Sequence, residues 1–243
     1  MNLSSLVSDL QSLANPAKAK DLKWFFKTGP GQYGAGDQFI GIIVPDIRKL
    51  VKLYWDVLDL SEVEILLHNP IHEFRLTALL ILVKKLSAAK SARGGYSQSK
   101  ENIYQFYLTN LKYINNWDLV DLSSRDIIGA YCFEHQNYSI LTKLSQSNDL
   151  WEKRIAIVST YFLIKRGIFS PTLTISLILL NDSHDLIHKA VGWMLREVGN
   201  RDQKILTDFL DRHCLKMPRT ALRYAIEKFP DPLRFHYLHQ RAG

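Results

Sequence analysis

Apolar residues recur at intervals of three and four along almost the whole chain, whereas the strict two-residue alternation of a half-buried strand is hard to find. Chain-breaking residues are also scarce. Twelve glycines and eight prolines make up about 8% of the 243 residues, below the roughly 12% that is usual. Both features favour helices, and we therefore expect an all-α protein.

Comparable helix starts, each with a charged residue followed by a small or apolar one, recur along the chain. They lie at Arg75, Asp118, Arg154, Lys189 and Arg219, at intervals of 43, 36, 35 and 30 residues. These intervals fall in the range of two-helix solenoid repeats, in which one helix per repeat lines a concave face. An irregular helical bundle is the alternative that the spacing leaves open.

Two segments interrupt the helical pattern. Residues 27–41 hold five of the twelve glycines, and residues 87–100 are polar and predict a surface loop. The first segment is not a phosphate-binding loop, because no strand precedes it and the GK[ST] ending is missing. We interpret it as a turn-rich connection between helices, with Lys27 and Tyr33 near a polyanion. Neither segment separates regions of different composition, so we expect a single domain over residues 1–243.

The charge balance points to a polyanionic partner. Lys and Arg number 31 against 24 Asp and Glu, a net charge of +7, and the sequence pI is about 9.3. Such a chain attracts nucleic acid. Cys132 and Cys214 are far apart and form no ligand spacing, which predicts buried free thiols in a reducing compartment. The chain has no signal peptide pattern and no long apolar run, so we expect it to be cytoplasmic, with no bound metal or cofactor.

The segment NNWDLVDLSSRDIIGAY brings an indole and a carboxylate together. Asn116 is expected to cap a helix that begins at Trp117 and continues to Tyr131. Trp117 and Asp121 are four residues apart and so share one helix face. The alternative is that Trp117 belongs to the core and Asp121 is a first-turn acid favoured by the helix dipole.

The segment DLIHKAVGWMLREVG at residues 185–199 predicts an amphipathic helix with a basic aromatic face. Its apolar stripe consists of Ile187, Val191, Met194, Leu195 and Val198. Trp193 projects to the opposite side, with Lys189 four residues before it and Arg196 three after it. Such a face suits stacking on a base or sugar while the cations contact phosphates.

Two cations begin the almost wholly apolar helix predicted over residues 150–165. Lys153 and Arg154 lie in its first turn, where positive charge opposes the helix dipole. A partner anion, either a phosphate or a carboxylate, would offset that cost. The alternative is that the side chains extend to water. Further basic residues follow near the carboxyl end: Lys216, Arg219, Arg223 and Lys228.

Together these segments resemble the AlkD-type DNA alkylation repair glycosylases over about residues 24–230. The motifs that carry the resemblance are FFKTGPGQYGAGDQFIGIIVPDIRKL, NNWDLVD, EKRIAIVSTYFLIKRG, DLIHKAVGWMLREVGNRD and MPRTALRYAIEKFP. The resemblance implies a right-handed solenoid of HEAT-like antiparallel helix pairs, with duplex DNA held in a basic concave channel. It also implies excision of cationic N3- and N7-alkylated purines.

The resemblance assigns roles to residues of this sequence. The family's WDLVD motif matches Trp117 and Asp121, its arginine before the IAI run matches Arg154, and its tryptophan in the VGWML helix matches Trp193. These four are the expected catalytic residues. The expected DNA-binding residues are Tyr33, Lys189, Arg196, Arg219 and Lys27.

No lysine nucleophile is evident, so we expect a monofunctional glycosylase whose product is an abasic site. The expected substrate is double-stranded DNA, and the expected oligomeric state is a monomer. Two other functions remain open. A non-catalytic protein that binds branched or damaged DNA would not need the complete catalytic set. A helical-repeat scaffold for another protein would present an apolar groove in place of a basic one.

Overall fold

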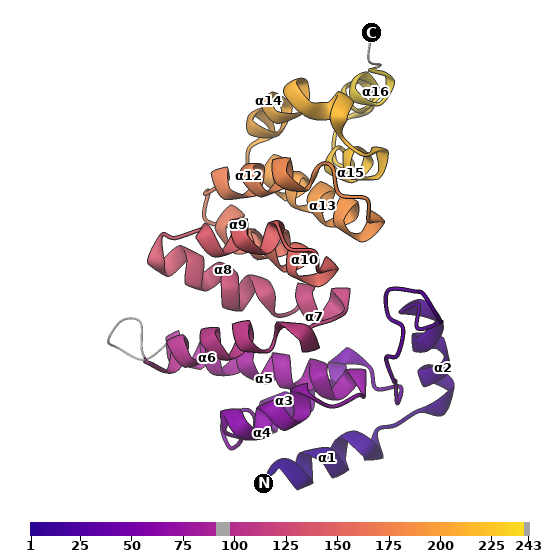
Figure 1. The fold of residues 1–243 in the computed structure, drawn as a ribbon, viewed down its shortest axis with the longest axis vertical. Helices are drawn as coiled ribbons and strands as arrows, with labels where there is room; N and C mark the ends of the chain where they lie inside the picture. Colours follow the sequence, from indigo (N-terminus) through magenta and orange to yellow (C-terminus); the bar gives the residue numbers. More distant parts are fainter. Residues whose placement is uncertain (91–97, 241–243) are drawn as a thin grey trace. The chain divides into compact units, whose positions relative to one another are not determined.

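The computed structural model describes residues 1–90 and 98–240, and helices account for the regular structure in this part of the chain (Figure 1). The β-structure recorded for these residues is an isolated bridge between Gln38 and Ile71. The prediction of an all-α protein is confirmed. The chain divides into two compact units, Met1–Ser123 and Ser124–Gly243. The expectation of one domain over residues 1–243 stays a prediction.

The first unit is built around helix α5. Its helices are α1 (Leu3–Ser12), α2 (Pro16–Phe25), α3 (Val44–Tyr54), α4 (Leu60–Leu67), α5 (His72–Lys90), α6 (Gln98–Thr109) and α7 (Trp117–Asp121), with a short 3-10 helix at Leu111–Tyr113. Helix α5 packs against α3, α4, α6 and α7. Residues 72–82 of α5 are all buried, as expected for a helix that is surrounded by others.

The second unit has two central helices, α10 and α13. Its helices are α8 (Ser124–His135), α9 (Ser139–Ser145), α10 (Leu150–Ser159), α11 (Tyr161–Ile164), α12 (Ser170–Leu179), α13 (Asp185–Arg201), α14 (Gln203–His213), α15 (Arg219–Ala225) and α16 (Asp231–His239), with a 3-10 helix at Cys214–Lys216. Helix α10 packs against α8, α9 and α13, and α13 packs in turn against α12, α14 and α15.

The recurring helix starts predicted from the sequence are confirmed. Each lies within the first five residues of a helix: Arg75 in α5, Asp118 in α7, Arg154 in α10, Lys189 in α13 and Arg219 in α15. The same residue pattern therefore marks helix starts in both units.

Two glycines allow helices of the second unit to approach closely. A Cβ atom on Gly192 of α13 would lie 2.4 Å from the carbonyl oxygen of Ala221 in α15. A Cβ atom on Gly129 of α8 would lie 2.3 Å from the carbonyl oxygen of Ser159 in α10. Real Cβ atoms do not approach backbone so closely, so each contact requires a residue without a side chain.

The single helix predicted from Trp117 to Tyr131 is wrong. Helix α7 ends at Asp121, and α8 begins only at Ser124. The buried hydroxyl of Ser123 contacts the Tyr107 hydroxyl at 2.9 Å and donates to the carbonyl oxygen of Leu119 at 2.5 Å. Serine side chains that bond locally in this way compete with helix continuation. Val120 and Ile127 therefore belong to two different helices.

The surface loop predicted over residues 87–100 is wrong at both ends. Helix α5 continues to Lys90 and α6 starts at Gln98, while residues 91–97 lie outside the described part of the chain. The extension of α5 contains Ala88 and Ala89, and alanine has the strongest helix propensity.

Both cysteines are buried free thiols, as predicted. Burial raises the pKa of the Cys132 thiol to about 12, so it stays protonated and unreactive at neutral pH. No helix in the described ranges is both long enough and apolar enough to span a membrane.

Replacement of Gly192 by alanine tests the close approach of α13 and α15. Alanine is the better helix former, so propensity alone predicts a gain in stability of about 1 kcal/mol. The clash with the backbone of Ala221 reverses the sign, and we expect a net loss of about 1 to 3 kcal/mol in the free energy of unfolding, measured by urea denaturation. Gly199→Ala is the matched control. Its Cβ atom would meet the end of the Leu206 side chain, which can rotate away, so the loss is smaller. Equal losses in the two variants would contradict this explanation.

Candidate active site

The glycine-rich segment at residues 27–41 forms a turn-rich connection between α2 and α3, as predicted. Its fold depends on close backbone contacts. The amide of Gly34 donates to the carbonyl oxygen of Lys27, and a Cβ atom on Gly34 would lie 2.3 Å from the carbonyl oxygen of Phe26. Gly41 adopts a φ of +89°, which disfavours any residue with a side chain. The loop thus folds tightly against the end of α2.

A buried carboxylate from α5 fixes the end of this loop. Glu73 is only 2% exposed, and its Oε1 accepts hydrogen bonds from the amides of Ile40, Gly41 and Ile42 at 3.1, 2.7 and 3.2 Å. A buried charge is costly unless donors surround it. The three amides supply these donors, and α5 therefore sets the position of the loop.

His72, the first residue of α5, lies between two carboxylates. Its Nδ1 lies 3.0 Å from Oδ2 of Asp37 in the loop, and its Nε2 lies 2.8 Å from Oδ2 of Asp118 in α7. Both ring nitrogens face acceptors, so both donate when the ring is protonated. Burial by itself would lower the pKa of His72, but the two carboxylates outweigh burial and raise it to about 9.

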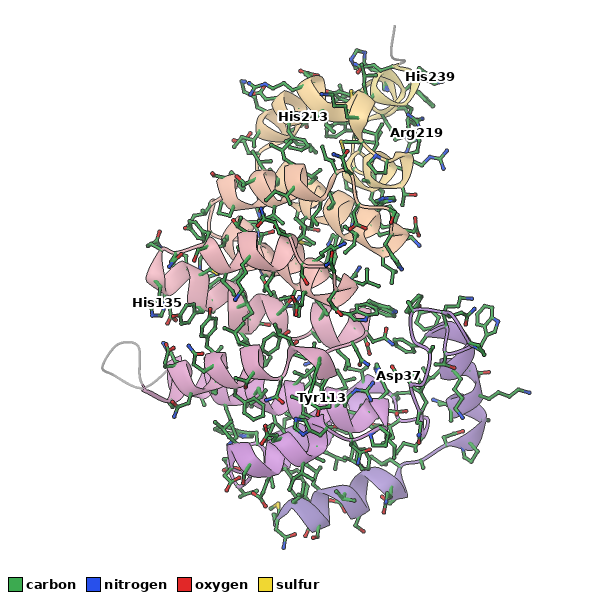
Figure 2. All side chains as sticks on the ribbon, in the orientation of Figure 1. Asp37, Tyr113, His135, His213, Arg219 and His239 are labelled. Atoms are coloured by element: carbon green, nitrogen blue, oxygen red, sulfur yellow. The ribbon has the colours of Figure 1, made fainter. Side chains whose placement is uncertain are left out.

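Asp37 is held from two further directions. Nη2 of Arg75 lies 2.5 Å from its Oδ1, and Nδ2 of Asn116 donates to its Oδ2 at 3.0 Å. Burial alone would raise the pKa of Asp37, but the bonds from His72, Arg75 and Asn116 lower it below its ordinary value. We call these five side chains the buried network: Asp37, His72, Arg75, Asn116 and Asp118. Its two carboxylates balance its two cations. Figure 2 labels Asp37 in the first unit, where its partners His72 and Arg75 belong to helix α5.

The network also starts helix α7. Asn116 is the predicted N-cap, and its Oδ1 accepts from the amide of Trp117 at 2.9 Å. In the usual cap the acceptor meets the second or third helical amide, and here it meets the first. Asp118 accepts from the amide of Leu119 at 2.8 Å through the oxygen that His72 does not use.

Trp117 and Asp121 line one cavity of about 560 Å³, confirming that they point the same way. The Trp117 ring is half-buried and stacks on Phe26, with centroids 5.1 Å apart and planes at 15°, while Phe25 meets it edge-on at 5.8 Å. The other lining residues are mostly apolar, with charged groups among them: Lys18, Asp21, Leu22, Phe39, Ile42, Ile43, Val44, Pro45, His72, Glu73, Leu76, Asp118 and Leu122.

The alternative explanation of Asp121 as a first-turn acid is wrong. Asp121 is the last residue of α7, where the helix dipole disfavours a negative charge, and Asp118 is the acid in the first turn. The helix dipole therefore does not explain the place of the Asp121 carboxylate.

In the second unit, the apolar stripe of α13 is confirmed. Its members are buried, whereas Trp193 is half-buried, with its ring centroid 6.2 Å from that of Tyr161. The flanking cations each contact an acid: Lys189 pairs with Asp185 at 2.7 Å, and Arg196 pairs with Glu227.

The two first-turn cations of α10 differ in their surroundings. Lys153 pairs with the carboxylate of Asp182 at 2.6 Å. Arg154 is only 5% exposed and donates from Nη1 to the carbonyl oxygen of Leu186 at 2.7 Å. The alternative in which Arg154 extends to water is therefore wrong. The joint action of Arg154 and Trp193 with Trp117 and Asp121 stays a prediction.

The remaining residues expected at DNA lie on the surface or near it. Lys27 lies over the Trp24 ring, with Nζ 4.5 Å from the centroid, and Tyr33 donates to the carbonyl oxygen of Phe25 at 3.4 Å. Arg219 is exposed and donates to the carbonyl oxygen of Leu238 at 2.9 Å. Their contact with DNA stays a prediction.

Sequence reasoning missed most of the buried network. The signal was available in HEFRLTALLILV, where three ionisable residues directly precede an apolar run. Charged side chains at the start of a helix that must be buried need buried partners of opposite charge. The pattern therefore predicts that such partners exist, but it does not identify them as Asp37 and Asp118. Across the described residues, no group of histidine, cysteine and acidic side chains is arranged to hold a metal ion.

Comparison with known proteins identifies the family of this chain. The model of the DNA alkylation repair enzyme family matches residues 6–229, nearly the whole chain. This chain belongs to the DNA alkylation repair enzyme family. Membership gives the protein a role in the repair of alkylated DNA. Its substrate is accordingly DNA.

The fold of the family is also seen in a solved structure described as a predicted DNA alkylation repair enzyme from Enterococcus faecalis. The two proteins share 16% sequence identity, with a TM-score of 0.70, over 90% of this chain and 97% of the other. At this identity the likeness shows the shared fold. No curated protein matches the chain.

The protonation of His72 makes the stability of this alkylation repair protein depend on pH. The folded-state pKa of about 9 lies above the ordinary value of 6.5, so the folded state binds the proton more tightly. The stabilisation is complete below pH 6.5 and is lost as pH rises through about 9. We expect the free energy of unfolding to fall by up to about 3 kcal/mol across this window, measured by denaturation at several pH values. A His72→Gln variant should lose this slope, and an unchanged slope would show that other groups cause it.

Proposed function

We propose that this protein is a monofunctional DNA glycosylase that removes cationic N3- and N7-alkylated purines from duplex DNA and leaves an abasic site. One observation carries the proposal. Trp117 and Asp121, the residues matched by the family's WDLVD motif, line one cavity, and the carboxylate lies where helix stability does not favour it. A group kept in an unfavourable position is a candidate for function.

The chemistry explains why a carboxylate is needed. Alkylation at N3 or N7 makes the purine cationic, so the base leaves as a neutral molecule with the electrons of the glycosidic bond. No general acid is required. The deoxyribose then develops the positive charge of an oxocarbenium-like transition state. A fixed carboxylate in a mostly apolar cavity stabilises that charge more strongly than water would.

Each proposed catalytic residue then has one task. Asp121 stabilises the cationic sugar and accepts a proton from the water that forms the new bond to the sugar carbon. Trp117 and Trp193 face the sugar, and each adds a cation–π attraction of about 0.5 to 2 kcal/mol. Arg154 holds a phosphate or the carboxylate in place through its charged hydrogen bonds.

The positive charge of the chain supports the assignment of duplex DNA as the substrate. The net charge is +7, and the proposed DNA contacts are Lys27, Tyr33, Lys189, Arg196 and Arg219. Lys189 and Arg196 pair with acids on exposed or half-exposed surface, and such pairs contribute little stability. Lys189 and Arg196 can therefore exchange these acids for DNA phosphates at little cost in folding free energy.

Asp121→Asn tests the catalytic role. The amide keeps the size of the side chain and removes its charge, so we expect release of 7-methylguanine from duplex DNA to slow by about 10²-fold. DNA affinity should change little, because the carboxylate acts on charge that develops during the reaction. Asp208→Asn, which removes a half-exposed carboxylate of α14, is the control and should leave release unchanged. Undiminished release by Asp121→Asn would eliminate the mechanism.

Salt dependence tests the DNA interface. If the proposed cations neutralise phosphates, counterions are released on binding, and affinity falls steeply between about 50 and about 200 mM salt. We expect a loss of at least about tenfold for an undamaged duplex, measured by fluorescence anisotropy. An affinity that does not respond to salt would argue against a basic DNA interface.

A further inference from the structure

The charged side chain of His72 links three separate elements beside the cavity. It bonds Asp37 of the 27–41 loop and Asp118 of α7 while it belongs to α5. His72 is 2% exposed and itself lines the cavity with Trp117 and Asp121. The packing of the loop and of α7 on α5 at this point therefore depends on one ring.

Helix α7 needs such external support. It has only five residues, and a helix of this length does not persist without tertiary contacts. The cap from Asn116 and the bond from Asp118 to His72 are the contacts that orient its first turn. Asp121 follows one turn later, so a shift of the first turn moves the proposed catalytic carboxylate.

His72 also reaches Trp117 indirectly, because the Phe26 ring contacts both of their rings. The Phe26 ring lies 5.0 Å from that of His72, at 41°, and 5.1 Å from that of Trp117, at 15°. Phe39 covers His72 at 4.6 Å and 23°. Aromatic faces attract a cation, so the protonated ring favours this arrangement. The position of the His72 ring thus influences the orientation of Trp117 through the Phe26 ring.

The charge of His72 also separates two acids. Asp118 and Asp121 lie three residues apart on α7, and like charges at this spacing repel. The imidazolium neutralises Asp118 and draws its carboxylate toward α5. The charged groups that face the ring are Asp37 and Asp118, with Arg75 bonded to Asp37; the neighbouring Glu73 is held by backbone amides.

We propose that His72, as an imidazolium clamped by Asp37 and Asp118, is a positioning residue that fixes Trp117 and Asp121 for attack on the alkylated nucleotide. The inference rests on the proposed glycosylase function. His72 does not itself contact the reacting atoms. It holds the short helix and pairs with the Asp118 carboxylate, and Asp121 is the α7 carboxylate proposed to act on the sugar.

The first test compares His72→Gln with His239→Gln, an exposed histidine near the carboxyl end. Glutamine can replace one of the two hydrogen bonds and carries no charge. We expect single-turnover release of 7-methylguanine to slow at least tenfold in His72→Gln while the Kd for duplex DNA stays within about twofold. His239→Gln should match the unaltered protein. Unchanged release in a folded His72→Gln variant would overturn the proposal.

The pH profile separates positioning from a general loss of structure. Release by the unaltered protein should decline as pH rises through about 9, where His72 loses its proton, and His72→Gln should lack this alkaline decline. Asp118→Asn provides a second variant in case His72→Gln does not fold. It removes one of the carboxylates that raise the His72 pKa, so the decline should move to lower pH. A decline at the same pH in Asp118→Asn would contradict the role of the pair.

A measurement on the free protein keeps this inference distinguishable from the proposed function. In ¹⁵N-labelled protein at pH 7.5, both ring nitrogens of His72 should be protonated, and their titration near pH 9 should coincide with a change in Trp117 fluorescence. A Trp117→Phe variant identifies that contribution. If the unaltered protein releases no base, the glycosylase proposal fails, while the coupled titration still decides whether His72 positions Trp117. If base is released but the two titrations do not coincide, the positioning proposal alone fails.

Discussion

The first unit depends on a balanced set of buried charges. Asp37, His72, Arg75, Asn116 and Asp118 come from the loop, from α5 and from the start of α7, and each satisfies hydrogen bonds of the others. Apolar packing is non-directional, so by itself it does not fix one register of the loop and α7 on α5. Hydrogen bonds between ions require specific distances and directions, so they select one arrangement. Removal of one partner leaves a buried charge without compensation, which is a large penalty.

The sequence predicts most of the secondary structure because helices depend on local patterns. The three- and four-residue spacing of apolar residues, the Asn116 cap and the recurring helix starts all correspond to observed features. The break between α7 and α8 could not be predicted in the same way. Ser123 bonds Tyr107, which is 16 residues away and whose position depends on the packing of α6. The pattern of residues around Ser123 cannot predict a contact that depends on the packing of another helix.

The candidate site was predicted in part for the same reason. Trp117 and Asp121 are neighbours on a helix face, so their spacing was enough to place them together. The network behind them joins residues 35 and 46 positions from His72, and pattern analysis of one segment cannot reveal such pairs. The family resemblance identified the residues expected to face the substrate. The residues that hold them became visible only in the folded chain.

The separation of Asp121 from the buried network has an evolutionary consequence. Asp121 lies at the end of α7, outside the set of charges that join α7 to the loop and to α5. A gene copy that lost this carboxylate would keep the hydrogen bonds that join those charges to one another. Descendants with the same architecture can therefore diverge in chemistry by a single codon, and sequence surveys should examine this position before assigning activity to a relative.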